Sequence, residues 1–224
     1  MGQKVNPRAL RLKGVQEFLN NWFSLDSYSV FLVEDDQIRQ FIEKKLKRSF
    51  MSKLIIKRKS SEQIILDIFT SKPGIVLGKG GESINNLKRQ LSEEFSKTFF
   101  INVIEEKSPD KSAKLLAELV AAQLEKRIPF RRAMKLIVQS SLKAGAEGIQ
   151  VKCSGRLGGV EIARTEWYQK GRMPKHTIHA KIDYAFVEAN TIYGKIGVKV
   201  WVNHGEVFND KPGDKQLHNP MSGK

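Results

Sequence analysis

The sequence predicts an α+β protein of two domains followed by a tail. Its 224 residues give room for about one or two domains of ordinary size. Helical and strand patterns alternate in the first half, whereas in the second half two helical patterns precede four strand patterns. We therefore divide the chain into a basic arm with a short helix, a first domain, a second domain and a polar tail: residues 1–34, 35–106, 107–209 and 210–224.

The N-terminal residues are expected to form an extended basic arm. Lys4, Arg8 and Arg11 lie on either side of Pro7, and an unpacked basic segment gains order by lying on phosphates. A solvated terminus is the alternative. Further on, four apolar residues at helical spacing predict a short helix: Val15, Phe18, Leu19 and Trp22.

The first domain shows the order helix, strand, strand, helix, glycine loop, helix, strand. An amphipathic stripe predicts a helix within roughly residues 35–50, and two β-rich runs with a basic turn between them predict a hairpin. A second stripe follows the glycine loop, and a third strand closes the domain. The residues that carry these patterns are Ile38, Phe41, Ile42 and Leu46; 53–58 and 64–70; Ile84, Leu87, Leu91 and Phe95; and 99–104.

The glycine loop has the spacing of a phosphate-contacting turn. A Walker A loop is excluded because only three residues separate Gly74 from Gly78, and a dinucleotide fingerprint would need glycine in place of Ser83. The remaining interpretations are a turn that binds nothing and a GXXG loop, which grips about four nucleotides of single-stranded nucleic acid. Together with the order of its neighbours, the loop resembles that of a type II KH domain, which has a three-stranded sheet with helices. This resemblance implies contacts to an RNA backbone from Gly78, Lys79, Gly80 and Gly81.

The second domain is predicted to place two helices on a four-stranded antiparallel sheet. The first helix starts at Ser108-Pro109-Asp110, a capping sequence, runs to about Ile128 and ends at Pro129. The second starts at once and stops near Gly145, with Leu136, Ile137 and Leu142 expected to be buried. The period-2 patterns that follow leave one sheet face covered and one exposed. They contain residues 149–153, a run from Val160, 178–186 and 196–202.

Charge and composition indicate a polyanionic partner. The formal charge is +15, and residues 131–224 alone carry 16 basic and 8 acidic side chains, so the second domain needs a polyanion contact of its own. The single cysteine, Cys153, excludes an internal disulfide and fits a reducing compartment. No apolar run approaches the ~20 residues of a membrane span, and no secretory signal is expected.

Catalytic or metal chemistry is not expected. The four histidines (His176, His179, His204 and His218) do not repeat at metal-ligand spacing, and the cysteine lacks a CXXC partner. Glu161 and Glu166 share an arginine-rich hairpin, where ion pairing is expected rather than acid/base work. We therefore predict no enzyme activity, no cofactor and no small-molecule substrate.

Several motifs carry a family resemblance over residues 1–208. Residues 155–168 read GRLGGVEIARTEWY, residues 171–174 read GRMP, and residues 193–201 read YGKIGVKVW. With the opening MGQKV, the chain resembles the third protein of the small ribosomal subunit in its bacterial or organellar form. The resemblance implies a ribosome-bound protein in a bacterial cytoplasm or organelle interior. It implies small-subunit ribosomal RNA and mRNA as partners, together with the tenth and fourteenth small-subunit proteins in the head and the fourth and fifth at the mRNA entry.

The resemblance also assigns site residues. Arg131, Arg132 and Lys135 match residues that line the mRNA entry channel, where cations would hold single-stranded mRNA and assist passive unwinding. Ribosomal RNA contacts are expected from the arm and from loops of the second domain: Lys4, Arg8, Arg11, Arg156, Arg164, Lys170, Arg172 and Lys175. The glycine loop departs from the frequent Gly-Lys-Lys-Gly and so has one cation fewer.

Two other functions fit parts of the sequence. A KH-type RNA-binding regulator that acts off the ribosome would explain residues 35–106 but not the block from Gly155 to Trp201. A nucleic-acid enzyme acting on damaged DNA is suggested by distant eukaryotic relatives. It would need a buried amine or carboxylate beside the strand. Salt-resistant cofractionation with the small subunit separates the ribosomal function from both.

Overall fold

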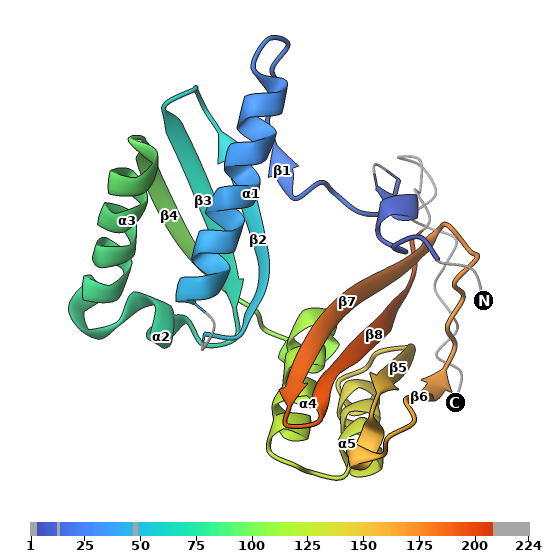
Figure 1. Cartoon of the computed structure of the whole chain (residues 1–224). Coiled ribbons are helices and arrows are strands. Elements are labelled where there is room, and N and C mark those ends of the chain that lie inside the picture. Colours follow the sequence, from blue (N-terminus) through green and yellow to red (C-terminus); the bar gives the residue numbers. More distant parts are fainter. Residues whose placement is uncertain (1–3, 13, 47–48, 208–224) are drawn as a thin grey trace, which may run out of the picture.

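The computed structural model describes residues 4–12, 14–46 and 49–207, and the predicted tail at 210–224 lies outside them. Figure 1 shows an N-terminal and a C-terminal domain, each with its own sheet. The first domain contains β1 (Asn20–Asn21), α1 (Tyr28–Lys45), β2 (Met51–Arg58), β3 (Gln63–Thr70), α2 (Pro73–Leu77), η2 (Lys79–Gly81), α3 (Glu82–Phe95) and β4 (Thr98–Glu105).

The N-terminal sheet confirms the predicted fold class but has four strands instead of the three predicted, because β1 adds to the edge of β2. Its strand order is β1-β2-β3-β4, in which β2 and β3 are antiparallel while β3 and β4 are parallel. α1 and α3 pack on this sheet through the predicted apolar stripes, which meet the strand residues in one core. α1 starts at Tyr28, before the predicted start near residue 35.

A buried ionic network holds the outer edge of this sheet to α1. The carboxylate of Asp35 accepts hydrogen bonds from the indole N–H of Trp22 at 2.6 Å, from the side-chain amide of Asn20 at 2.9 Å, and from Arg58 Nε at 3.0 Å. Arg58 also pairs with Glu34 at 2.9 Å. The Asp35 and Arg58 side chains are almost fully buried, so each charge depends on the other for compensation.

The C-terminal domain has the predicted two helices and four-stranded antiparallel sheet. The sheet order is β6-β5-β8-β7, and α4 covers β7 and β8 while α5 covers β5 and β6. Its core includes the buried Cys153, and burial raises the pKa of this thiol to about 12. The elements are η3 (Pro109–Lys111), α4 (Ala113–Glu125), α5 (Phe130–Lys143), β5 (Gly148–Gly155), η4 (Leu157–Gly159), β6 (Arg164–Gly171), β7 (Ala180–Thr191) and β8 (Gly194–Glu206).

The N-terminal segment differs from the prediction in two ways. The expected helix over Val15 to Trp22 is wrong: this stretch begins in a turn at Val15 and contains β1, which pairs in parallel with β2. The expectation of an arm free of the domains is also wrong at Arg11, which follows Ala9 and Leu10 in the short helix η1 (Ala9–Arg11) and is only 1% exposed. Over residues 15–22, the pairing of β1 with β2 overrides the helical spacing of the apolar residues.

The Arg11 guanidinium is bound by backbone carbonyls of the C-terminal domain. Nε donates to the Ala180 oxygen at 2.7 Å, while a terminal nitrogen donates to the Thr177 oxygen at 2.8 Å and the Lys175 oxygen at 3.1 Å. The other terminal nitrogen bonds to the Pro7 oxygen at 2.8 Å, within the arm itself. Burial lowers the pKa of Arg11. The planar five-donor fork suits this many acceptors, which a lysine could not reach together.

We predict that Arg11→Ala lowers the free energy of unfolding by roughly 2–4 kcal/mol, because several buried carbonyls lose a charged donor. Arg11→Lys keeps the charge but not the fork and should fall between Arg11→Ala and the parent. Lys4→Ala, at an exposed position of the same arm, serves as the control and should change stability by less than about 0.5 kcal/mol. Urea unfolding followed by circular dichroism measures all three, and equal midpoints for Arg11→Ala and Lys4→Ala would contradict this role.

Candidate nucleic-acid interface

The glycine loop lies between α2 and α3 in a conformation that requires glycine. Gly78, Gly80 and Gly81 have φ values of 71°, 61° and 81°, in the left-handed region. A Cβ atom at Gly78 would lie 2.2 Å from the hydroxyl oxygen of Ser83, whereas one at Gly80 would meet no atom within 4 Å. Lys79 is exposed at the tip. The loop therefore presents backbone N–H groups and one cation at the start of a 14-residue helix, an arrangement suited to phosphate.

The cations at the start of α5 are all exposed. Arg131, Arg132 and Lys135 lie on the surface, whereas Ala133, Met134, Ile137 and Val138 of the same helix enter the core. Two cations four residues apart share one side of a helix, as predicted. The expectation of a buried Leu136 is wrong, since this side chain is 49% exposed. α5 is covered by the sheet over a narrower stripe than the sequence indicated.

Glu166 of β6 joins two cations whose predicted partners differ, mRNA for Arg131 and ribosomal RNA for Arg164. Its carboxylate bonds to Arg164 Nε at 2.9 Å and to Arg131 Nε at 3.4 Å. Both guanidinium groups also lie near the ring of Phe130, at 5.6 Å and 5.7 Å from its centroid. The predicted ion pairing of Glu166 is therefore confirmed, and the hydrogen bond from Arg164, followed by that from Arg131, holds the pKa of this carboxyl below its usual range.

The result is one basic surface built by a helix and a strand. We call it the α5–β6 surface and define it as Arg131, Arg132, Lys135 and Arg164. Lys135 lies 5.8 Å from the ring centroid of Tyr168, one more contact between α5 and β6. The sequence could not show that residues 131 and 164 meet, because their proximity depends on how α5 packs against β6.

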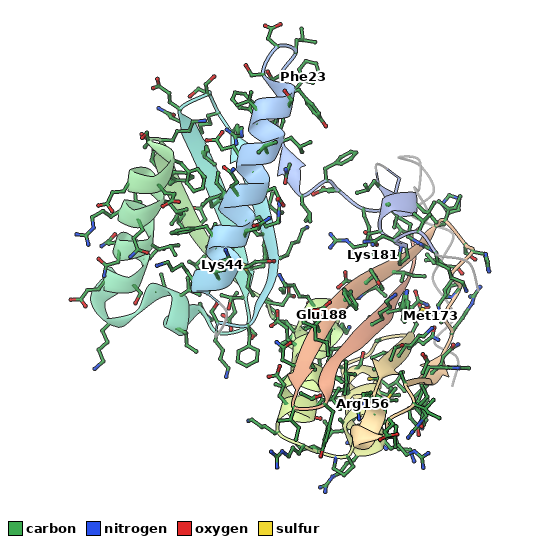
Figure 2. All side chains as sticks on the ribbon, viewed as in Figure 1. Phe23, Lys44, Arg156, Met173, Lys181 and Glu188 are labelled. Carbon is green, nitrogen blue, oxygen red and sulfur yellow. The ribbon has the colours of Figure 1, made fainter. Side chains whose placement is uncertain are left out.

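The other predicted RNA-contacting cations of the C-terminal domain do not form one cluster with the α5–β6 surface but lie at separate turns and strand ends. Arg156 donates to the backbone oxygens of Val160 at 2.9 Å and Tyr193 at 3.3 Å, which hold it at a turn. Figure 2 shows Arg156 at the end of this domain opposite to Lys181. Lys170 is exposed near the end of β6, and Arg172 pairs with Glu206 at 2.8 Å.

Lys175 and the arm differ from these loops in burial. Lys175 lies over the ring of Trp201, 4.4 Å from its centroid, and burial lowers its pKa. In the arm, Lys4 is exposed and Arg8 half-buried. Arg11 is occupied by carbonyls, so the expected phosphate contact from this residue does not fit its position.

In the part of the chain that the structure describes, no group of three or more His, Cys, Asp or Glu side chains could hold a metal ion. No helix there combines the length and apolar character needed to cross a membrane. The exposed cations and the glycine loop instead are groups of the kind that contact phosphates in nucleic-acid complexes.

These features define a protein that combines a KH domain with a second, basic α+β domain. Residues 37–111 match the family described as "KH domain", and residues 120–202 match the family described as "Ribosomal protein S3, C-terminal domain". The chain belongs to the uS3 family of small ribosomal subunit proteins. The matched relatives are named as ribosomal proteins and not as enzymes.

Three relatives, each named "Small ribosomal subunit protein uS3", illustrate the similarity. The protein of Desulfitobacterium hafniense is 49% identical over 211 residues, 94% of this chain and 96% of the relative. That of Clostridium botulinum is 49% identical over 221 residues, 98% of this chain and 100% of the relative. That of Acinetobacter baumannii is 48% identical over 221 residues, 98% and 87% of the two chains.

We predict that Glu166→Gln strengthens binding to RNA, because the neutral amide releases Arg131 and Arg164 for phosphates. The slope of log affinity against log salt should steepen by about one for each cation that gains a phosphate. Filter binding of a small-subunit RNA fragment at several salt concentrations measures this slope. Glu161→Gln, an exposed change of equal charge in the same hairpin, is the control. Equal slopes in the two variants would show that the Glu166 ion pairs do not restrain the cations.

Proposed function

We propose that the protein is a structural constituent of the small ribosomal subunit that binds ribosomal RNA in the head and helps line the mRNA entry channel. The observation that carries this proposal is the exposed α5–β6 surface, in a chain that belongs to the uS3 family. Such a surface attracts a phosphate backbone without reading base sequence. Ribosomal RNA contacts are proposed for Arg156, Lys170 and Arg172, which lie in or beside turns of the C-terminal domain.

At the entry channel the cations would act by holding a single strand. Side chains from α5 and β6 contact successive phosphates, and a duplex, which is wider than a single strand, is resisted at the same place. Strands then separate as translocation pulls the mRNA through. This is passive unwinding and requires no nucleotide hydrolysis. The proposed protein neighbours are the tenth and fourteenth small-subunit proteins in the head and the fourth and fifth at the entry. The proposed location is on ribosomes in a bacterial cytoplasm or an organelle.

Cofractionation tests the ribosomal assignment itself. The tagged protein should sediment with small subunits and remain there through a high-salt wash, because many phosphate contacts and protein contacts hold it. A KH-type regulator acting off the ribosome would be released by the wash, since the KH domain contributes only a few backbone contacts. Release at moderate salt would overturn the proposed function.

We predict that ribosomes carrying Arg131→Ala, Arg132→Ala and Lys135→Ala translate unstructured mRNA normally but pass slowly through a stable mRNA hairpin, by roughly threefold or more. The physical reason is the loss of three phosphate contacts at the point of strand separation. A control removes the same charge at exposed positions elsewhere, through Lys44, Lys59 and Lys143. Single-ribosome hairpin transit measures the effect, and equal transit times in both triple variants would exclude a channel role for α5.

We predict that Lys79→Asp with Gly80→Asp abolishes RNA crosslinking at the glycine loop while the fold is retained. The position at Gly80 has space for a side chain, and aspartate tolerates the left-handed conformation better than most residues. Two carboxylates would then repel phosphate. Gly78→Ala is the contrasting variant, expected to destabilise the loop because its Cβ meets Ser83. Undiminished crosslinking in the double aspartate variant would show that the loop is a turn without ligand.

A further inference from the structure

The sheet of the C-terminal domain has one face covered by α4 and α5 (Figure 1). Its opposite face carries different side chains. Core residues such as Val151 and Val198 point to the helices, so their neighbours Lys152 and Lys199 point to the other side. We call this the open face.

One row across the open face combines two aromatic rings and two lysines. Strand register places Trp167 of β6 beside Lys152 of β5, then Lys199 of β8, then Phe186 of β7. Neighbouring strands lie ~4.8 Å apart, so the two rings are separated by roughly 14 Å with both cations between them. This order is aromatic, cation, cation, aromatic, contributed in turn by β6, β5, β8 and β7.

The two rings are exposed to an extent that core packing does not explain. Trp167 is 59% exposed and Phe186 is 50% exposed. The Lys199 ammonium lies 5.6 Å from the centroid of the Phe186 ring, and so the cation and the ring share one surface. Large aromatic side chains are costly to leave in water, and a flat π-face beside a cation is the usual platform for a nucleobase.

The next row along the strands lies on the same face. Gln150, Trp201 and Tyr184 are register partners, and the rings of Tyr184 and Trp201 lie 5.3 Å apart at 42°. These side chains are at least half-buried. Lys175 lies over Trp201, so that a further cation borders the platform.

The charges of the open face favour an anionic partner. The carboxylate of Glu188 on β7 forms an ion pair with the Lys195 ammonium at 2.7 Å. Lys152 and Lys199 lie at the centre of the row, and an apolar protein partner would bury both ammonium groups without compensation, which is costly. A single strand of RNA offers bases for the rings and phosphates for the lysines.

We propose that the open face binds single-stranded RNA, with bases stacked on Trp167 and Phe186 and the intervening phosphates held by Lys152 and Lys199. The inference rests on the proposed RNA-binding function but assigns a site on the face of the sheet opposite to α5. It differs in mechanism from the basic loops. The loops act through charge, whereas this platform adds stacking, which depends weakly on salt.

The test uses the full-length protein and two probes of equal length, a 12-nucleotide oligoadenylate and an abasic 12-mer with the same number of phosphates. The parent should bind oligoadenylate at least fivefold more tightly than the abasic strand, and Trp167 fluorescence should be quenched on binding. Trp167→Leu and Phe186→Leu keep an apolar side chain but remove the ring. Each should lower oligoadenylate affinity roughly 5- to 100-fold, with the salt slope unchanged.

Two controls separate this site from a general loss of binding. Ile162→Ala removes an apolar side chain that is 84% exposed outside the row and should leave affinity unchanged. Trp167→Phe keeps a ring and should restore most of the affinity lost in Trp167→Leu while reducing the quenching to the part that comes from Trp22 and Trp201. Circular dichroism checks that each variant is folded.

Four results would overturn the platform. Equal affinity for the adenylate and abasic strands, or unchanged affinity in both leucine variants, would show that only charge binds RNA. The proposed function would survive these two results if the chain still entered small subunits. Protection of Trp167 in assembled subunits by a neighbouring protein, with no RNA crosslink to the open face, would assign the surface to protein contact. Failure of the parent to bind either strand or to enter subunits would overturn both proposals.

Discussion

The Arg11 guanidinium is the contact on which the placement of the N-terminal segment depends. It bonds to carbonyls between Lys175 and Ala180, while a few residues later Asn20 and Asn21 extend the N-terminal sheet. The segment therefore bridges both domains, which are also joined through the chain around η3, through the packing of α4 against β2, and through a 2.6 Å ion pair between Lys114 and Glu43. A polar cavity of about 480 Å³ lies at this junction. Two connections restrict interdomain rotation more than one linker does.

The C-terminal sheet places the two proposed RNA-binding surfaces on opposite faces. Alternation along β6 sends Glu166 and Tyr168 toward α5, where they order the cations of the α5–β6 surface, and sends Trp167 to the opposite side. Adjacent residues of one strand therefore serve different surfaces. A one-residue shift in register would exchange them, so the buried core that fixes the register also fixes both surfaces.

Local patterns were sufficient for most elements. Period-2 alternation predicted β5, β7 and β8, and helical spacing predicted α3, α4 and α5, because each of these elements buries one side in a core. The strand expected from Val160 is wrong in its start: β6 begins at Arg164, because η4 and a bend occupy the residues before it and leave Ile162 84% exposed. The prediction failed over residues 15–22, where the apolar spacing fitted a helix but backbone pairing with β2 decided the conformation. It also failed at Leu136, since the width of the buried stripe of α5 depends on the helix–sheet packing.

The sequence by itself determined the two-domain α+β class, the glycine loop, the basic character and the pairing of Glu166 with arginine, since all of these follow from residue type and short-range spacing. Only the tertiary structure decided which cations are available. Arg11 and Arg131 are both predicted from the sequence to contact RNA, yet Arg11 is enclosed by carbonyls whereas Arg131 lies on the surface. Strand register across β6, β5, β8 and β7 decided that two rings and two lysines form one row. Such pairings join residues far apart in the chain, and local spacing carries no information about them.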